Sequence, residues 1–210
     1  MTATLNGMTL PSWACHIEDK QAPMPLLLVQ AFVDTLDRDL GTDIFAHAGE
    51  ARAWLADAGL RVPDPDRPDA GLDAGFADDL RLAREARASI HALIGRNTGS
   101  EPLAPDDLAP LEQVLGQAQP RLDVGADGRV RLGPDLPAHA LTDGLLGLLL
   151  IIRDAQADGS WDRLKLCGNP DCRWAFYDRS HSRRGAWCDM ATCGNRLKNR
   201  SLRARRAQAG

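Results

Sequence analysis

The sequence lacks a long apolar run. Its longest apolar stretch, Leu145 to Ile152, has eight residues, whereas a helix that crosses a bilayer core needs about 20. The first residues also lack the basic and then apolar segments of a secretion signal. We therefore expect a cytoplasmic protein with no membrane partner. Its 210 residues, 44% hydrophobic and 26% charged, exclude a mostly disordered or fibrous chain.

Signatures of common enzymes and repeats are missing as well. The sequence contains no H-E-x-x-H, G-x-S-x-G, Walker A or G-x-G-x-x-G motif, and no internal repeat. Its histidines His47, His91 and His139 are scattered without the spacing of metal ligands. We therefore expect a protein that is not an enzyme.

Lysine is scarce, because only three of the 25 basic residues are lysines. Arginine abundance fits either a GC-rich bacterial genome or phosphate recognition by the planar guanidinium. Genome composition does not explain how the charges cluster. Residues 161–210 hold 12 basic and 4 acidic residues, a net charge of +8, and residues 1–160 hold 13 and 25, a net charge of −12. This asymmetry predicts two modules, of which the basic one is a candidate for binding a polyanion.

Cysteine is also rare, yet four of the five cysteines lie within 27 residues. They form two C-x4-C pairs that are separated by 15 residues: Cys167, Cys172, Cys188 and Cys193. This spacing predicts one structural Zn²⁺, because four thiolates complete a tetrahedron and leave no open position for catalysis. An iron–sulfur cluster is the main alternative; a redox pair is less favoured, because the spacing is not C-x-x-C. We expect Cys15 and His181 to take no part.

Apolar residues recur at helical spacing in five segments. These lie at about residues 26–36, 51–58, 73–94, 108–115 and 137–152, with Asp73 and Pro137 as candidate helix starts. Between the last two segments, Leu122, Val124, Val130 and Leu132 alternate with polar residues around Asp127-Gly128, which predicts a β-hairpin. We predict a mainly α domain with one hairpin over residues 23–158, after an irregular segment 1–22.

Residues 161–206 should form a small α+β zinc module. Cys188 and Cys193 are five residues apart, about 140° from alignment on a regular helix, so both cannot face one ion from it. One must lie in the turn before the helix and the other at the helix start. A first cysteine knuckle, a strand in which Trp174 and Phe176 cover the metal, and a ligand-bearing helix to about Arg206 describe a treble-clef-like finger.

The segment from Cys167 to Arg196 resembles the CGNR zinc-finger family, named for the tetrad Cys193-Gly194-Asn195-Arg196. The resemblance covers about residues 161–206. It places in register the four cysteines and Phe176, Asp178, Ser180, Trp187 and Met190.

The preceding region resembles the ABATE domain, in the Phe32-Val33-Asp34-Thr35-Leu36 stretch, the helix end at Gly59-Leu60 and the hairpin. The family more often has Asn in place of Asp34, so a ligand contacting this residue would differ here. The resemblance implies a stress-responsive bacterial transcription regulator.

On this basis we expect the finger to bind DNA and the helical domain to sense a small-molecule effector or mediate dimerisation. The candidate contacts are Arg183, Arg184, Asn195, Arg196, Lys198, Arg200 and Arg203. Most would contact phosphates. Asn195 and Arg196 are candidates for base edges, because Asn pairs bidentately with adenine and Arg with guanine. Alternatively, Asn195 caps the helix and Arg196 pairs with Asp178.

Other functions stay open at this stage. A single small finger binds DNA weakly, so we expect a homodimer. The acidic domain should not touch DNA, and it could fold over the basic tail and inhibit it. The alternatives to DNA binding are a protein-interaction module, an RNA-binding module, and a small-molecule-binding protein in which the finger only stabilises the fold.

Overall fold

The computed structural model describes residues 4–5, 8–9, 11–17, 20–61, 75–100, 102–133, 138–197 and 199–200. Its helices are α1 (Leu26–Val33), α2 (Ala48–Asp57), α3 (Phe76–Arg96), α4 (Pro105–Gln117) and α5 (Leu141–Asp158). The short helical turns are η1 (Ser12–Ala14), η2 (Ile44–Ala46), η3 (Trp161–Arg163) and the π-helical η4 (Met190–Gly194). The strands pair as the antiparallel hairpins β1 (Thr4–Leu5) with β2 (Met8–Thr9), β3 (Leu36–Asp37) with β4 (Thr42–Asp43), β5 (Arg121–Val124) with β6 (Val130–Gly133), and β7 (Leu164–Leu166) with β8 (Ala175–Tyr177). The predicted class, mainly α with small hairpins, is confirmed.

Helix α1 is the centre of the apolar core. All eight of its residues are buried, which is the arrangement expected for a helix that is apolar on every side. It contacts both α3 and α5. Phe32 on α1 packs against Phe45 and Trp54, with ring centroids 5.7 and 6.1 Å away. Trp54 and Phe76 are both buried in the core.

The β7–β8 hairpin belongs to this same core. Leu164 and Leu166 on β7 and Ala175 on β8 are buried in the cluster that includes α1, α3 and α5. Side chains of α1 also bind the backbone of β8. Gln30 Nε2 donates to the carbonyl of Ala175 at 3.1 Å, and Asp34 Oδ1 accepts from the amide of Ala175 at 2.8 Å. The start of the zinc module is thus held directly by the helical domain.

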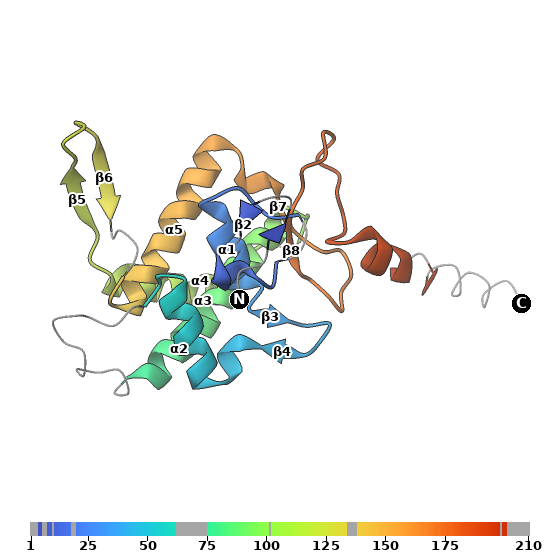
Figure 1. The fold of residues 1–210 in the computed structure, drawn as a ribbon, viewed down its shortest axis with the longest axis horizontal. Coiled ribbons are helices and arrows are strands. Elements are labelled where there is room, and N and C mark those ends of the chain that lie inside the picture. Colours follow the sequence, from blue (N-terminus) through green and yellow to red (C-terminus); the bar gives the residue numbers. More distant parts are fainter. Residues whose placement is uncertain are drawn as a thin grey trace, which may run out of the picture.

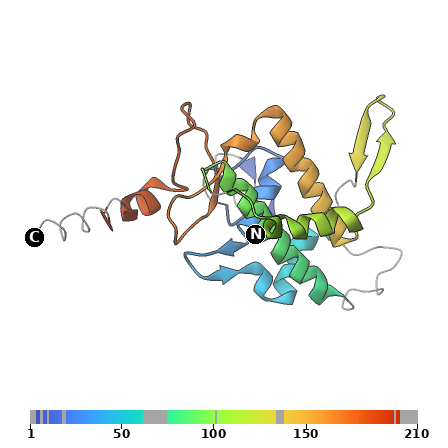
Figure 2. The same cartoon turned by 180° about the vertical axis from the view of Figure 1, so that it is seen from behind.

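The β5–β6 hairpin forms where the sequence predicted it, with Leu122 opposite Leu132 and Val124 opposite Val130. Its apolar side chains are nevertheless exposed, and Val124 is 73% accessible. Figures 1 and 2 show this hairpin projecting from the helical body on the side opposite the C-terminal module. The hydrophobic alternation therefore marks strand pairing here without burial.

Two local expectations differ from the structure, and a third is untested. The first helix ends at Val33, and Leu36 lies instead in β3, a hairpin that the sequence did not reveal. Within segment 1–22, which we expected to be irregular, the structure has β1, β2 and η1, and Trp13 and Ile17 are buried in the core. The predicted helix starts Asp73 and Pro137 lie outside the described residues, and α3 begins after Gly75 at a φ of 84°.

Candidate metal centre and finger surface

The four clustered cysteines come together at one point. Cys167 directly follows β7, Cys172 lies in the turn before β8, Cys188 lies in the loop after it, and Cys193 lies within η4. All four Sγ atoms lie within 4.8 Å of one another. The Sγ of Cys188 is 3.7 Å from that of Cys172 and 3.8 Å from that of Cys193. A tetrahedron with Zn–S bonds of about 2.3 Å has sulfurs about 3.8 Å apart, so these residues fit one Zn²⁺.

The two cysteines of the second pair reach the metal site from different local structures. Cys188 lies before η4 and Cys193 within it, which agrees with the predicted division between a turn and a helix start. Asp189 begins this turn as its N-cap, because its carboxylate accepts from the amides of Ala191 at 3.0 Å and Thr192 at 2.8 Å. The sequence did not predict the π-helical turn; Cys188 reaches the site from the chain before it, next to the extended N-cap residue Asp189.

The protonation of the cysteines also points to a cation. Hydrogen bonds from Cys172 and Cys188 lower the pKa of Cys167 to about 2. The resulting thiolate raises the pKa of Cys172 to about 12 and that of Cys188 further. Four thiolates this close repel one another, so they ionise together only when a cation neutralises them. A divalent metal supplies that charge and deprotonates its thiol ligands.

Neighbouring groups shield and orient the sulfurs. Trp174 and Trp187 are partly buried and pack against the cysteine cluster. Buried Asn169 directs its Nδ2 at the Sγ of Cys193, 3.6 Å away, which is a contact suited to a thiolate. The predicted cover by Trp174 is present. Phe176 is buried elsewhere, with Lys20 Nζ 4.9 Å from its ring centroid.

A buried ion pair closes the loop that carries the basic residues. Asp178 Oδ2 accepts from Lys165 Nζ at 2.9 Å and from the amide of Gly185 at 2.7 Å, and its Oδ1 accepts from the amide of Ser180 at 3.0 Å. Burial alone would raise the pKa of Asp178, but these hydrogen bonds outweigh it and hold the pKa well below its usual range. The sequence reasoning missed Lys165, because a lone lysine in a short strand gives no pattern.

Arg196 pairs with a different carboxylate from the one that the sequence suggested. Its Nη1 lies 2.8 and 2.7 Å from the two carboxylate oxygens of Asp39, in the β3–β4 turn, so the alternative pairing with Asp178 is wrong. Asp178 is already saturated by Lys165 and backbone amides. A hairpin of two-residue strands has too little periodicity for its position to be predicted, and only Asp37 and Gly41 mark its turn.

The other predicted contact residues are spread over the finger surface. Arg183 and Arg184 are exposed in the loop between β8 and η4. Exposed Asn195 donates from Nδ2 to the carbonyl of Ala191 at 3.1 Å, a contact within its own helical segment. Exposed Arg200 pairs with Asp171 at 2.9 Å. Lys198 and Arg203 lie outside the residues whose side chains the structure describes.

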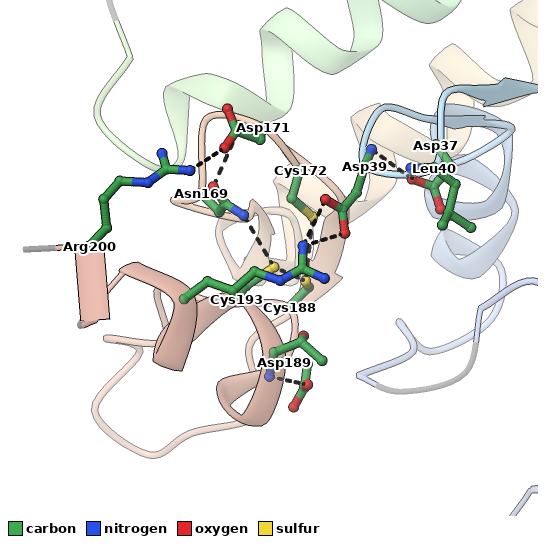
Figure 3. A network of polar contacts seen from close by, with 12 residues as sticks. Asp37, Asp39, Leu40, Asn169, Asp171, Cys172, Cys188, Asp189, Cys193 and Arg200 are labelled. Carbon is green, nitrogen blue, oxygen red and sulfur yellow. Dashed lines mark hydrogen bonds and ion pairs between the residues drawn. The ribbon is translucent and has the colours of Figure 1, made fainter.

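A chain of polar contacts joins Arg200 to the metal centre. Figure 3 shows Arg200 paired with Asp171, whose amide donates to Asn169 Oδ1 at 3.3 Å, and Asn169 in turn directed at Cys193. The β3–β4 turn that holds Asp39 is itself fixed to α3. Arg87 donates from both Nη atoms to Asp43, at 2.6 and 2.7 Å. The partners of Arg200 and Arg196 are thus both held in place, Asp171 by the metal centre and Asp39 by α3.

Comparison with known families agrees with this architecture. Residues 163–206 match the CGNR zinc finger, and residues 27–157 match the family described as "Putative stress-induced transcription regulator", the ABATE domain. The search of curated proteins gave no match. Among the described residues, no helix is long and apolar enough to cross a membrane. The four cysteines are the ligands of one structural Zn²⁺, and the chain belongs to the ABATE family, with a CGNR zinc finger after the ABATE domain.

Proposed function

We propose that the protein is a DNA-binding transcription regulator and not an enzyme. The zinc finger binds DNA, and the helical domain senses an effector or mediates dimerisation. One observation carries the proposal: the zinc-organised finger exposes Arg183, Arg184, Arg196 and Arg200, in a segment with a net charge of +8. Phosphate neutralisation by such arginines releases counterions and supplies sequence-independent affinity. The family description supports the regulatory role.

The ion pairs of Arg196 and Arg200 are compatible with DNA binding. The side chains of Arg196 and Asp39 are 55% and 32% exposed, and those of Arg200 and Asp171 are 62% and 58% exposed. Exposed pairs contribute little to stability, because solvent screens them. A DNA phosphate or base edge can therefore replace either aspartate at little cost, and Arg196 becomes available once it leaves Asp39.

Arg183 and Arg184 need no such exchange to reach phosphates. In our proposal these two residues and Arg200 contact the DNA backbone, and Arg196 contacts a base edge. Asn195 keeps its carbonyl oxygen and one amide hydrogen free of the contact with Ala191, so it can take part beside Arg196. The bound operator site then fixes the register of the finger through these two residues.

Fluorescence anisotropy with labelled genomic DNA fragments at several salt concentrations tests the proposal. We expect wild-type affinity to fall linearly with the logarithm of salt concentration. Arg183→Ala/Arg184→Ala should reduce the slope by about 1.8, because each lost phosphate contact removes about 0.9. The matched control, Arg121→Ala/Arg129→Ala, removes two exposed arginines of the β5–β6 region and should leave the slope unchanged.

Two results would contradict DNA binding. An equal loss of slope in both double variants would indicate a general charge effect. Saturable binding to one protein at high salt, without affinity for DNA, would indicate a protein-interaction module instead.

A further inference from the structure

A cavity of about 650 Å³ lies beside the metal centre. The β3–β4 hairpin and the end of α1 form one wall, and the finger forms the other, including Trp174 and three of the metal-binding cysteines. Its volume lies within the range of about 300–1,000 Å³ that small-molecule sites occupy. The cavity is therefore large enough for a ligand that contacts both parts of the chain.

The cavity is lined by negative charge. Four acidic side chains border it, those of Asp34, Asp37, Asp39 and Asp189, and its lining residues include no lysine or arginine. Burial raises the pKa of Asp34 well above its usual range, so the charge of the lining comes mainly from the other three. The lining also includes His16. Burial lowers the pKa of its imidazole, so this side chain is neutral at pH 7. Figure 3 shows Asp37 and Asp39 on the side of the β3–β4 turn and Asp189 on the side of the finger. Carboxylates from two sides favour a ligand with more than one positive group.

Asp34 provides an independent indication of a binding site. It is 3% exposed, and its Oδ1 accepts from the amide of Ala175. Its Oδ2 is buried and has no hydrogen-bond partner in the described part of the chain. Buried polar atoms are nearly always hydrogen-bonded, so this oxygen calls for a partner. Burial raises the pKa of Asp34, and a cationic donor at Oδ2 would offset that effect by stabilising the ionised carboxylate. Asp34 also borders a second cavity of about 60 Å³, lined by Arg38, Arg84, Arg87 and Arg173, which has room for water but repels cations.

We propose that the larger cavity binds a short aliphatic diamine or polyamine. One ammonium group donates to Asp34 Oδ2, and a second lies against the carboxylates of Asp37 and Asp39. The methylene chain packs against the apolar side chains of Leu40, Ile44 and Trp174, which line the same cavity. The ammonium groups and the methylene chain of the ligand thus match the carboxylates and the apolar side chains of the wall.

This inference rests on the proposed function, in which the helical domain senses an effector. The site also connects the ligand to the finger. Asp39 holds Arg196, which we assign to DNA contact, by two contacts of 2.7–2.8 Å. A ligand ammonium at Asp39 competes with that guanidinium. Diamine binding and release of Arg196 are then linked, and removal of Arg196 should tighten diamine binding by the same linkage.

Isothermal titration calorimetry of the zinc-loaded full chain with 1,4-diaminobutane tests the site without DNA. We expect one saturable site with a Kd below about 1 mM. Asp34→Asn and Asp37→Asn should each weaken it at least about tenfold, the loss expected when a charge-assisted hydrogen bond is removed. Both substitutions retain the Oδ1 that accepts backbone amides. Arg196→Gln should tighten binding.

Controls separate a built site from general charge attraction. Asp123→Asn on the exposed β5 strand should leave diamine binding unchanged, and succinate, an anion of the same chain length, should not bind. Absence of saturable diamine binding would overturn the proposed site. An ordered water would then be the partner of Asp34 Oδ2. Equal weakening by Asp34→Asn and Asp123→Asn would also overturn it. DNA binding is measured separately without diamine, so failure of either proposal is recognised independently.

Discussion

Loss of the metal should disorder the finger loop and leave the β7–β8 hairpin in place. We consider Cys188→Ser, which removes one of four ligands from a partly buried position. Structural zinc contributes about 10–16 kcal/mol of apparent binding free energy in isolated finger peptides. The loop from Arg183 to η4 depends on that contribution, because it closes on the sulfurs and has few apolar side chains in the main core.

The hairpin has a different source of stability. Leu164 and Leu166 are 0% and 1% exposed in the main core. Burial of a leucine contributes about 1.5–3 kcal/mol, so the two together contribute about 3–6 kcal/mol without any metal. Two hydrogen bonds of Ala175 add to this: its carbonyl accepts from Gln30, and its amide donates to Asp34. The helices α1, α3 and α5, which share that core, should keep their structure.

Hydrogen exchange with metal analysis measures both parts in one experiment. In Cys188→Ser we expect loss of bound zinc, fast exchange of the amides of Gly168 and Gly194, and continued protection of the β7–β8 amides. Those two amides donate to Ala186 and Asp189 in the metal-organised loops. Cys15→Ser, at an exposed position, is the matched control and should retain zinc. Full protection of Gly194 without metal, or equal loss of protection in β7–β8, would refute this division.

Three further predictions concern stability, measured by urea denaturation. Asp178→Asn should destabilise the fold by about 3–5 kcal/mol, since it leaves a buried ammonium group without its partner; an unchanged midpoint would contradict this. Gly144→Ala should cost more than about 1 kcal/mol, because its Cβ would lie 2.0 Å from the carbonyl oxygen of Leu60. Gly116→Ala, with open space around it, should instead stabilise by up to about 1 kcal/mol. Burial lowers the pKa of His91 from 6.5 to about 4, so stability should fall as pH drops through that window, and a His91→Gln variant should lose this component.

The sequence predicted the parts of this fold that depend on periodicity or on ligand spacing. Helical periodicity found α1 to α5, and two C-x4-C pairs predicted the four metal ligands. The missed features depend on tertiary contacts. The β3–β4 hairpin has strands of two residues, too short for any pattern, and Arg87 of α3 fixes it by pairing with Asp43. Nothing in a linear sequence indicates that Asp39 in its turn meets Arg196, 157 residues later.

Charge asymmetry suggested two separate modules, whereas the core joins them at one hairpin. Gln30 on α1 and Asp34, the C-cap of α1, satisfy both backbone groups of Ala175, which are buried and would otherwise be unpaired. These contacts need the strand to lie against α1, and an apolar pattern does not specify them. The two family matches meet near residue 160, but residues from both matches share one apolar core.

This packing limits where a regulatory change can occur. Movement of β8 would expose the buried leucines of β7 and leave the backbone of Ala175 without partners, which is costly. The segment from Arg183 to Arg200 has weaker links to the helical domain, among them the exposed pair of Arg196 with Asp39 and the contact of Lys20 with the carbonyl of Trp187. Exposed contacts of this kind exchange at little cost, because solvent screens them. An effector beside the β3–β4 turn would therefore act by releasing Arg196 from Asp39, while the metal centre and β7–β8 hold the backbone of the finger in place.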